Sequence, residues 1–165
     1  SRMKTEQVLM TKDGMSRLHA RLADAHDAYH RVCEDNEVAA TSGETSVWHD
    51  SFDYEENQRQ MHMLGREVHR LRDLAERAQV VAPDPQPKRA DVGCVVTIDL
   101  AGQTQQWLLA GWDDGDPKIG RLAYNSPLGM ALWGAELGEV RECRVSGQVK
   151  EVEIVAIAPA AVEAT

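Results

Sequence analysis

Residues 124–134 read Tyr-Asn-Ser-Pro-Leu-Gly-Met-Ala-Leu-Trp-Gly. Ser126 is a residue type that caps helices, because its side-chain oxygen accepts a hydrogen bond from a backbone N–H group of the first turn. Pro127 suits the first helical position, where a backbone N–H group is not needed. Gly134 is typical of a helix end. The run therefore predicts a short helix that begins at the Ser-Pro pair and stops at Gly134.

The segments on both sides of this helix have the composition of β-strands. All six prolines lie in the second half of the chain, together with most of the 12 glycines. β-branched residues alternate with polar ones between these breaks, as in strands that are joined by turns. The predicted strands are 92–100, 105–111, 122–124, 140–145 and 149–157. Together they predict a small antiparallel sheet domain over 91–158, followed by a tail over 159–165.

The first half, in contrast, is rich in helix-forming residues. Apolar residues recur three and four positions apart, which is the spacing of a coiled-coil seam. Thr11 is the predicted N-cap of the first helix. Two such seams with a short break between them predict an antiparallel helical hairpin over 3–81. The seams consist of Met15, Leu18, Leu22, Ala25, Tyr29 and Val32, and of Met61, Leu64, Val68, Leu71, Ala75 and Ala78, with Tyr54 extending the second seam toward the turn.

The hairpin and the sheet domain are separated by a proline-rich segment, 82–90, with three prolines at alternate positions. Proline cannot continue a helix and favours an extended backbone, so this segment is predicted to be a semi-rigid linker. The predicted fold class is therefore α+β: an N-terminal antiparallel coiled-coil hairpin and a C-terminal antiparallel sheet domain with one short helix.

The turn of the predicted hairpin is strongly acidic. Eight acids and no lysine or arginine lie between Arg31 and Arg59. One interpretation is a solvated loop, whose acids interact favourably with the dipole of the second helix. The other is that the carboxylates meet a cation, for which Mg²⁺ is the suitable ion because it often takes only one or two protein carboxylates. Trp48 and Phe52 lie beside these acids and either pack the turn or contact a partner.

Composition and motifs argue against several classes of function. The 165 residues include 27 acids and 18 bases, a net charge of -9, which argues against direct binding to duplex nucleic acid. No apolar run approaches the ~20 residues of a membrane-spanning helix, and we expect a cytoplasmic protein without membrane contact. The three cysteines form no CxxC motif. Because nucleotide-binding and nucleophile motifs are also missing, the sequence predicts no free-standing active site.

The order of these elements resembles the Gre transcript-cleavage factors of bacteria, GreA and GreB. The resemblance extends over about 10–157, and its most specific part is 124–134, which looks like the Ser-Pro helix of the family's C-terminal domain. Residues 137–140 look like the turn that follows this helix, and 92–97 look like the opening strand of the domain. Residues 78–81 match the end of the family's second helix.

This resemblance implies that the C-terminal domain has an FKBP-like fold and docks on the rim of the secondary channel of bacterial RNA polymerase. Its docking contact would lie around Asn125, Ser126 and Pro127. The hairpin would enter the channel, where two tip acids help to hold a second Mg²⁺ in the active site of the polymerase, which hydrolyses backtracked RNA. The chain would then bind no cofactor alone, act as a monomer, and meet nucleic acid only within the transcription complex.

The resemblance also points to particular tip acids. Cleavage-active members carry a Gly-Asp-x-x-Glu-Asn-x-Glu-Tyr run, and Tyr54 matches its last residue. Asp50 then stands in place of the first Glu, and Glu44 takes the place of the Asp if three residues are inserted in the turn. The predicted catalytic acids and Mg²⁺ ligands within the polymerase complex are therefore Glu44 and Asp50, with Asp53 as a substitute.

Three other functions remain open. Asp50 is one methylene shorter than Glu, and a misplacement of about 1 Å can cost ~100-fold in a catalytic site, so the chain could occupy the channel and inhibit or regulate transcription without cleavage. It could instead be an FKBP-like prolyl isomerase, or a module whose hairpin pairs with helices of another protein. An isomerase pocket would need a ring of aromatic residues, for which the sequence offers Trp107, Trp112, Tyr124 and Trp133.

Overall fold

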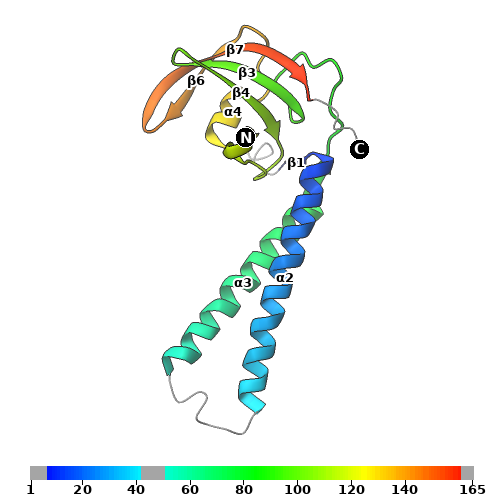
Figure 1. Cartoon of the computed structure of the whole chain (residues 1–165), viewed down its shortest axis with the longest axis vertical. Helices are drawn as coiled ribbons and strands as arrows, with labels where there is room; N and C mark the ends of the chain where they lie inside the picture. Colours follow the sequence, from blue (N-terminus) through cyan, green and yellow to red (C-terminus); the bar gives the residue numbers. More distant parts are fainter. Residues whose placement is uncertain (1–6, 42–50, 161–165) are drawn as a thin grey trace. The chain divides into compact units, whose positions relative to one another are not determined.

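The computed structural model describes residues 7–41 and 51–160, and the side chains of 7–37 and 54–160. The chain divides into two compact units. One unit is Ser16–Arg77, and the other combines the segment up to Met15 with the segment from Ala78 onward. The fold belongs to the α+β class, with a helical hairpin and a small sheet domain (Figure 1).

The hairpin consists of α2 (Lys12–Thr41) and α3 (Ser51–Arg77), which lie side by side in Figure 1. Asn36 Nδ2 lies 3.5 Å from Met61 Sδ, and the ring of Tyr29 lies against Gly65. As one residue moves toward the N-terminus of α2, its neighbour moves toward the C-terminus of α3, which is the register of an antiparallel pair.

The capping and seam predictions can be compared with the packing of this hairpin. The N–H group of Gly14 donates to Thr11 Oγ1 over 2.9 Å, so Thr11 caps α2 as predicted. Leu18, Val68 and Leu71 are buried as seam residues. Two positions differ from the prediction: Leu74 is also buried, and Tyr54 is 48% exposed. An α-helical stripe drifts relative to a strict seven-residue repeat, so the apolar face is wider than the predicted seam.

The helix α3 ends one residue before the predicted seam does. Residues Ala78–Val80 form strand β2, which pairs in parallel with β1 (Val8–Met10). The expected helix end over 78–81 is therefore wrong. β1 is buried over its whole length, and the N–H group of Trp112 donates to Leu9 O over 2.9 Å. These contacts place β1 and β2 with the sheet, whereas the predicted range 3–81 had assigned both to the hairpin.

The larger sheet has the strand order β5-β4-β3-β7-β6. Its strands are β3 (Cys94–Leu100), β4 (Gln103–Ala110), β5 (Arg121–Ala123), β6 (Val140–Val145) and β7 (Gln148–Pro159). β3 to β4, β3 to β7 and β6 to β7 are antiparallel. β5 pairs in parallel with β4, which differs from the predicted antiparallel sheet. The reason is the connection through the short helix η2 (Pro117–Ile119), which returns the chain before β5 begins.

One face of this sheet is packed on helix α4 (Pro127–Leu132). The core between them contains Val96, Ile98, Leu132, Val152 and Ile154, which are all at most 1% exposed. Gly129 of α4 lies directly against the backbone of the segment that precedes the helix. A Cβ atom at this position would overlap Ala123 O and the backbone of Tyr124. Only a glycine at this position therefore allows α4 to pack so closely. Among the helices of residues 7–41 and 51–160, none has the length and hydropathy that a membrane span requires.

A candidate docking surface at helix α4

The predicted tip residues are not placed by the structure. Glu44, Trp48 and Asp50 lie outside the described residues, and Phe52 and Asp53 belong to the first turn of α3, where side chains are not described. The proposed catalytic pair therefore remains a prediction from the sequence. In the part of the chain that is described, no group of three or more His, Cys, Asp or Glu side chains could hold a metal ion.

The predicted docking residues, in contrast, lie together where α4 begins. Ser126 has an extended backbone, with φ -72° and ψ 161°. Its Oγ accepts a hydrogen bond from the N–H group of Gly129 over 3.1 Å and donates to Ala123 O over 2.7 Å. Pro127 occupies the first turn of the helix. The Ser-Pro pair thus fixes the direction in which α4 leaves β5.

Asn125 is joined to a residue that sequence reasoning did not select. The backbone N–H group of Asp113 donates to Asn125 Oδ1, and Asn125 Nδ2 donates to Asp113 Oδ1, both over 2.8 Å. Asp113 has a φ of 53°, in the left-handed region. The sequence signal is weak: residues 113–117 have the composition of a turn, and nothing in it indicates contact with Asn125.

Tyr124, next to this pair in the chain, is a core residue. Its side chain is 1% exposed, and its hydroxyl accepts from the Leu9 N–H group over 3.0 Å and donates to Gln7 O over 2.8 Å. Its ring centroid lies 4.9 Å from that of Trp133 and 6.1 Å from that of Trp112. Burial, together with the negative charge of Asp113, raises the pKa of Tyr124. A side chain that is buried and hydrogen-bonded in this way cannot line an open isomerase pocket.

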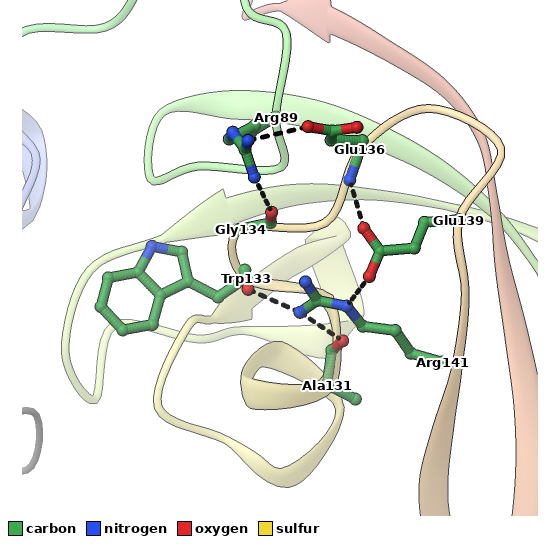
Figure 2. A network of polar contacts seen from close by, with 7 residues as sticks. All are labelled: Arg89, Ala131, Trp133, Gly134, Glu136, Glu139 and Arg141. Atoms are coloured by element: carbon green, nitrogen blue, oxygen red, sulfur yellow. Dashed lines mark hydrogen bonds and ion pairs between the residues drawn. The ribbon is translucent and has the colours of Figure 1, made fainter. Parts of the chain in front are cut away.

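The other end of α4 is held by two arginines, which Figure 2 shows pointing toward backbone carbonyls. Arg141 Nη1 donates to Trp133 O over 2.8 Å and to Ala131 O over 3.4 Å. Arg89 donates to Gly134 O over 3.2 Å. Because the last carbonyl groups of a helix lack partners within it, arginine donors there stabilise the helix end.

Two glutamates complete this network. Arg89 forms an ion pair with Glu136 at 2.7 Å, and Arg141 Nε forms a hydrogen bond with Glu139 at 2.5 Å. Glu139 also accepts a hydrogen bond from the N–H group of Glu136 over 3.0 Å. That backbone N–H group, followed by the Arg141 guanidinium, lowers the pKa of Glu139. The loop between α4 and β6 is thus tied to both arginines, so the helix is fixed at its two ends.

Comparison with known proteins links this region to transcription. Residues 85–159 match the family described as transcription elongation factor, GreA/GreB, C-terminal. The chain is 28% identical over 138 residues to transcription elongation factor GreA of Chloroflexus aurantiacus, covering 80% of this chain and 85% of the relative. It is also 28% identical over 142 residues to GreA of Sphingopyxis alaskensis, covering 85% of this chain and 88% of the relative.

Comparison with solved structures also gives a match to the crystal structure of Gfh1 from Thermus aquaticus. It is 20% identical to this chain, covers 93% of this chain and 99% of Gfh1, and gives a TM-score of 0.44.

Proposed function

We propose that this chain, a member of the Gre-factor family through its GreA/GreB C-terminal domain, binds RNA polymerase at the rim of the secondary channel and modulates elongation from there. The observation that carries the proposal is the family match over 85–159. This match contains the run 124–134, where Ser126 caps α4 and Pro127 begins it. Docking through Asn125, Ser126 and Pro127 would use a segment that lies within this match and that the sequence resemblance selects.

The hairpin is long enough to act at a distance from such a docking surface. α3 has 27 residues, and a helix rises about 1.5 Å per residue, which gives a length of about 40 Å. Few of the described side chains of α2 and α3 are buried. A rod of this length would carry its turn from the rim of the channel toward the active site of the polymerase.

Stimulation of RNA cleavage is the activity we propose for the turn. Glu44 and Asp50, with Asp53 as a substitute, would contribute carboxylates to a Mg²⁺ ion that the polymerase also holds. Carboxylate oxygens suit this ion, which retains sites for water and phosphate. A second metal in the polymerase can activate water and stabilise charge on the attacked phosphate. The residues of the chain would only deliver ligands, so hydrolysis would remain the chemistry of the polymerase.

A transcript-cleavage assay tests this function. Backtracked elongation complexes of the cognate polymerase are incubated with Mg²⁺, with and without the chain. We expect the wild type to accelerate the release of short 3′ RNA fragments. In the double variant Glu44→Ala/Asp50→Ala this stimulation should be at least about tenfold weaker, because the metal ligands are missing. Asp24→Asn is the matched control, since Asp24 is an exposed acid of α2 outside the turn.

The same assay distinguishes the alternative function. Slower elongation without fragment release would show that the chain occupies the channel as an inhibitor or regulator, an alternative that the shorter side chain of Asp50 favours. Equal stimulation by the wild type and the double variant would contradict the assignment of the tip acids. Absence of any effect, together with absence of polymerase binding, would contradict the proposed function as a whole.

A further inference from the structure

A pair of histidines lies on one side of α2, in the hairpin unit. The ring centroids of His26 and His30 are 4.5 Å apart, and the angle between the ring planes is 63°. His26 is half-buried and His30 is exposed. Residues four apart are neighbours on a helix surface, and two histidines at this spacing are a known way for a helix to present imidazoles to one metal ion. The proposed function makes no use of this pair.

The separation of the two rings matches that of two imidazoles bound to one metal ion. A metal–nitrogen distance of about 2.0–2.1 Å puts the metal roughly 3.2 Å from the centre of each ring. Adjacent ligands of a tetragonal site are at right angles, so their ring centres lie about 4.5 Å apart. The observed separation of 4.5 Å agrees with this value. A tetrahedral site would separate the ring centres by about 5.2 Å, so the geometry favours a tetragonal ion.

The backbone that carries the pair is ordered without a metal. Both histidines lie in the interior of α2 (Lys12–Thr41), away from the ends where helices fray. Tyr29, which lies between them in the chain, places its ring against Gly65 of α3. The turn is therefore packed on the partner helix. Ligands that are preorganised in this way lose less conformational entropy when they bind.

The charges along this part of α2 favour a cation. Asp24, Asp27 and Glu34 are exposed acids, whereas Arg31 is an exposed base. An excess of negative charge raises the local concentration of cations. Within residues 7–37 and 54–160, no third His, Cys, Asp or Glu side chain completes a ligand set with the pair. The chain therefore supplies two ligands, and water fills the other positions of the ion.

We propose that His26 and His30 form a two-histidine site for a divalent transition-metal ion of the copper and nickel class. Each imidazole donates the lone pair of one ring nitrogen to the ion. Imidazole is a preferred ligand of both metals, and tetragonal geometry is typical of both. Because the two ligands come from successive turns of α2, the bound ion also stabilises the helical form of this segment. The proposal does not depend on polymerase binding.

Titration of the whole chain, without an added histidine tag, with Ni²⁺ tests the site. Calorimetry should show one bound Ni²⁺ ion per chain. We expect His30→Gln to weaken this binding at least about tenfold, because a second ligand on the same helix acts at high effective concentration. His26→Gln should weaken it by a similar factor. Ni²⁺ should also raise the melting temperature of the helical signal in the wild type but not in His30→Gln, since a ligand of the folded form stabilises it.

His62→Gln is the matched control for these variants. His62 is an exposed histidine of α3, and no other histidine lies three or four residues from it. This variant should bind Ni²⁺ as the wild type does. Cu²⁺ at substoichiometric amounts then locates the site, because a paramagnetic ion broadens the NMR signals of the imidazoles that bind it. The signals of His26 and His30 should broaden before those of the other histidines.

Each outcome decides for or against the site. One Ni²⁺ ion bound by the wild type, with weaker binding in both His26→Gln and His30→Gln, supports it. Equal affinity of the wild type and His30→Gln overturns it, and so does broadening that begins at a histidine outside the pair. An equal loss in His62→Gln also overturns it, since this would indicate binding shared among all histidines. Absence of wild-type binding at millimolar Ni²⁺ overturns it as well. Polymerase binding is measured without these metals, so none of these results affects the proposed function.

Discussion

The hairpin and the sheet unit are stabilised in different ways. In the described part of the hairpin, the buried apolar side chains are Leu18, Val68, Leu71 and Leu74. The sheet unit buries a continuous cluster that extends from β1 through β3, α4 and β7. The described hairpin thus has a small set of buried side chains, whereas a residue such as Leu132 belongs to an extended core. The two functions are therefore divided within the chain: the hairpin provides length with little burial, and the sheet unit provides a surface whose residues are held in place by a core.

Substitution of a glycine by alanine in the sheet unit should give the largest effect. In Gly129→Ala the new Cβ atom overlaps Ala123 O and the backbone of Tyr124, so α4 must move. Overpacking of this kind costs about 3 kcal/mol of unfolding free energy. Denaturant unfolding followed by tryptophan fluorescence measures it, because Trp107, Trp112 and Trp133 belong to this unit. Unchanged stability of Gly129→Ala would contradict the close packing of α4.

The same substitution in the hairpin should have the opposite sign. In Gly65→Ala the new Cβ atom lies 3.6 Å from the Tyr29 ring, which is an ordinary contact. Alanine is favoured over glycine within a helix by about 1 kcal/mol. The helical signal in circular dichroism should therefore persist to higher temperature, whereas a lower unfolding temperature would show that the space beside Tyr29 is needed. Stability changes of opposite sign at positions 65 and 129 would show directly that the two units differ in how tightly they are packed.

The smallest effect is expected in the surface network at the end of α4. The pKa of Glu139 is lowered in the folded chain, chiefly by the N–H group of Glu136 and then by Arg141. A lowered pKa stabilises the fold above the pKa of the unfolded state, and this stabilisation is lost as pH falls through the folded pKa. Glu139→Gln should therefore lower the unfolding temperature slightly at pH 7 and not at all in acid. An equal difference at both pH values would contradict this account.

Local chemistry explains which features the sequence could predict. The start of α4 was predicted because Ser126 and Pro127 act on their immediate neighbours, and β6 was predicted with its observed bounds. The hairpin turn between β6 and β7 lies at Ser146 and Gly147, which both have positive φ. Each of these features depends on residues a few positions apart, so the local sequence pattern is enough to predict it.

Features that depend on distant residues could not be predicted in the same way. β2 has only three residues, and its pairing with β1 joins positions about 70 apart; alone, Ala78 reads as one more seam residue. Asp113 and Asn125 come from different connections, and their contact requires the parallel pairing of β4 and β5. The roles of Glu44 and Asp50 stay predictions from the family resemblance, because these residues lie outside the described part of the chain.

The division of the chain between its two units has a consequence for the order of folding. Strand β1 precedes the hairpin in sequence but is buried in the sheet unit, so residues 16–77 interrupt that unit. Closing a loop of this length costs conformational entropy that grows with the number of flexible residues. An antiparallel pair of helices returns the chain near to its starting point, and it can form from contacts within 16–77 alone. We therefore expect the hairpin to form first during synthesis and, by bringing β1 close to β2, to act as a folding aid for the domain that later anchors it.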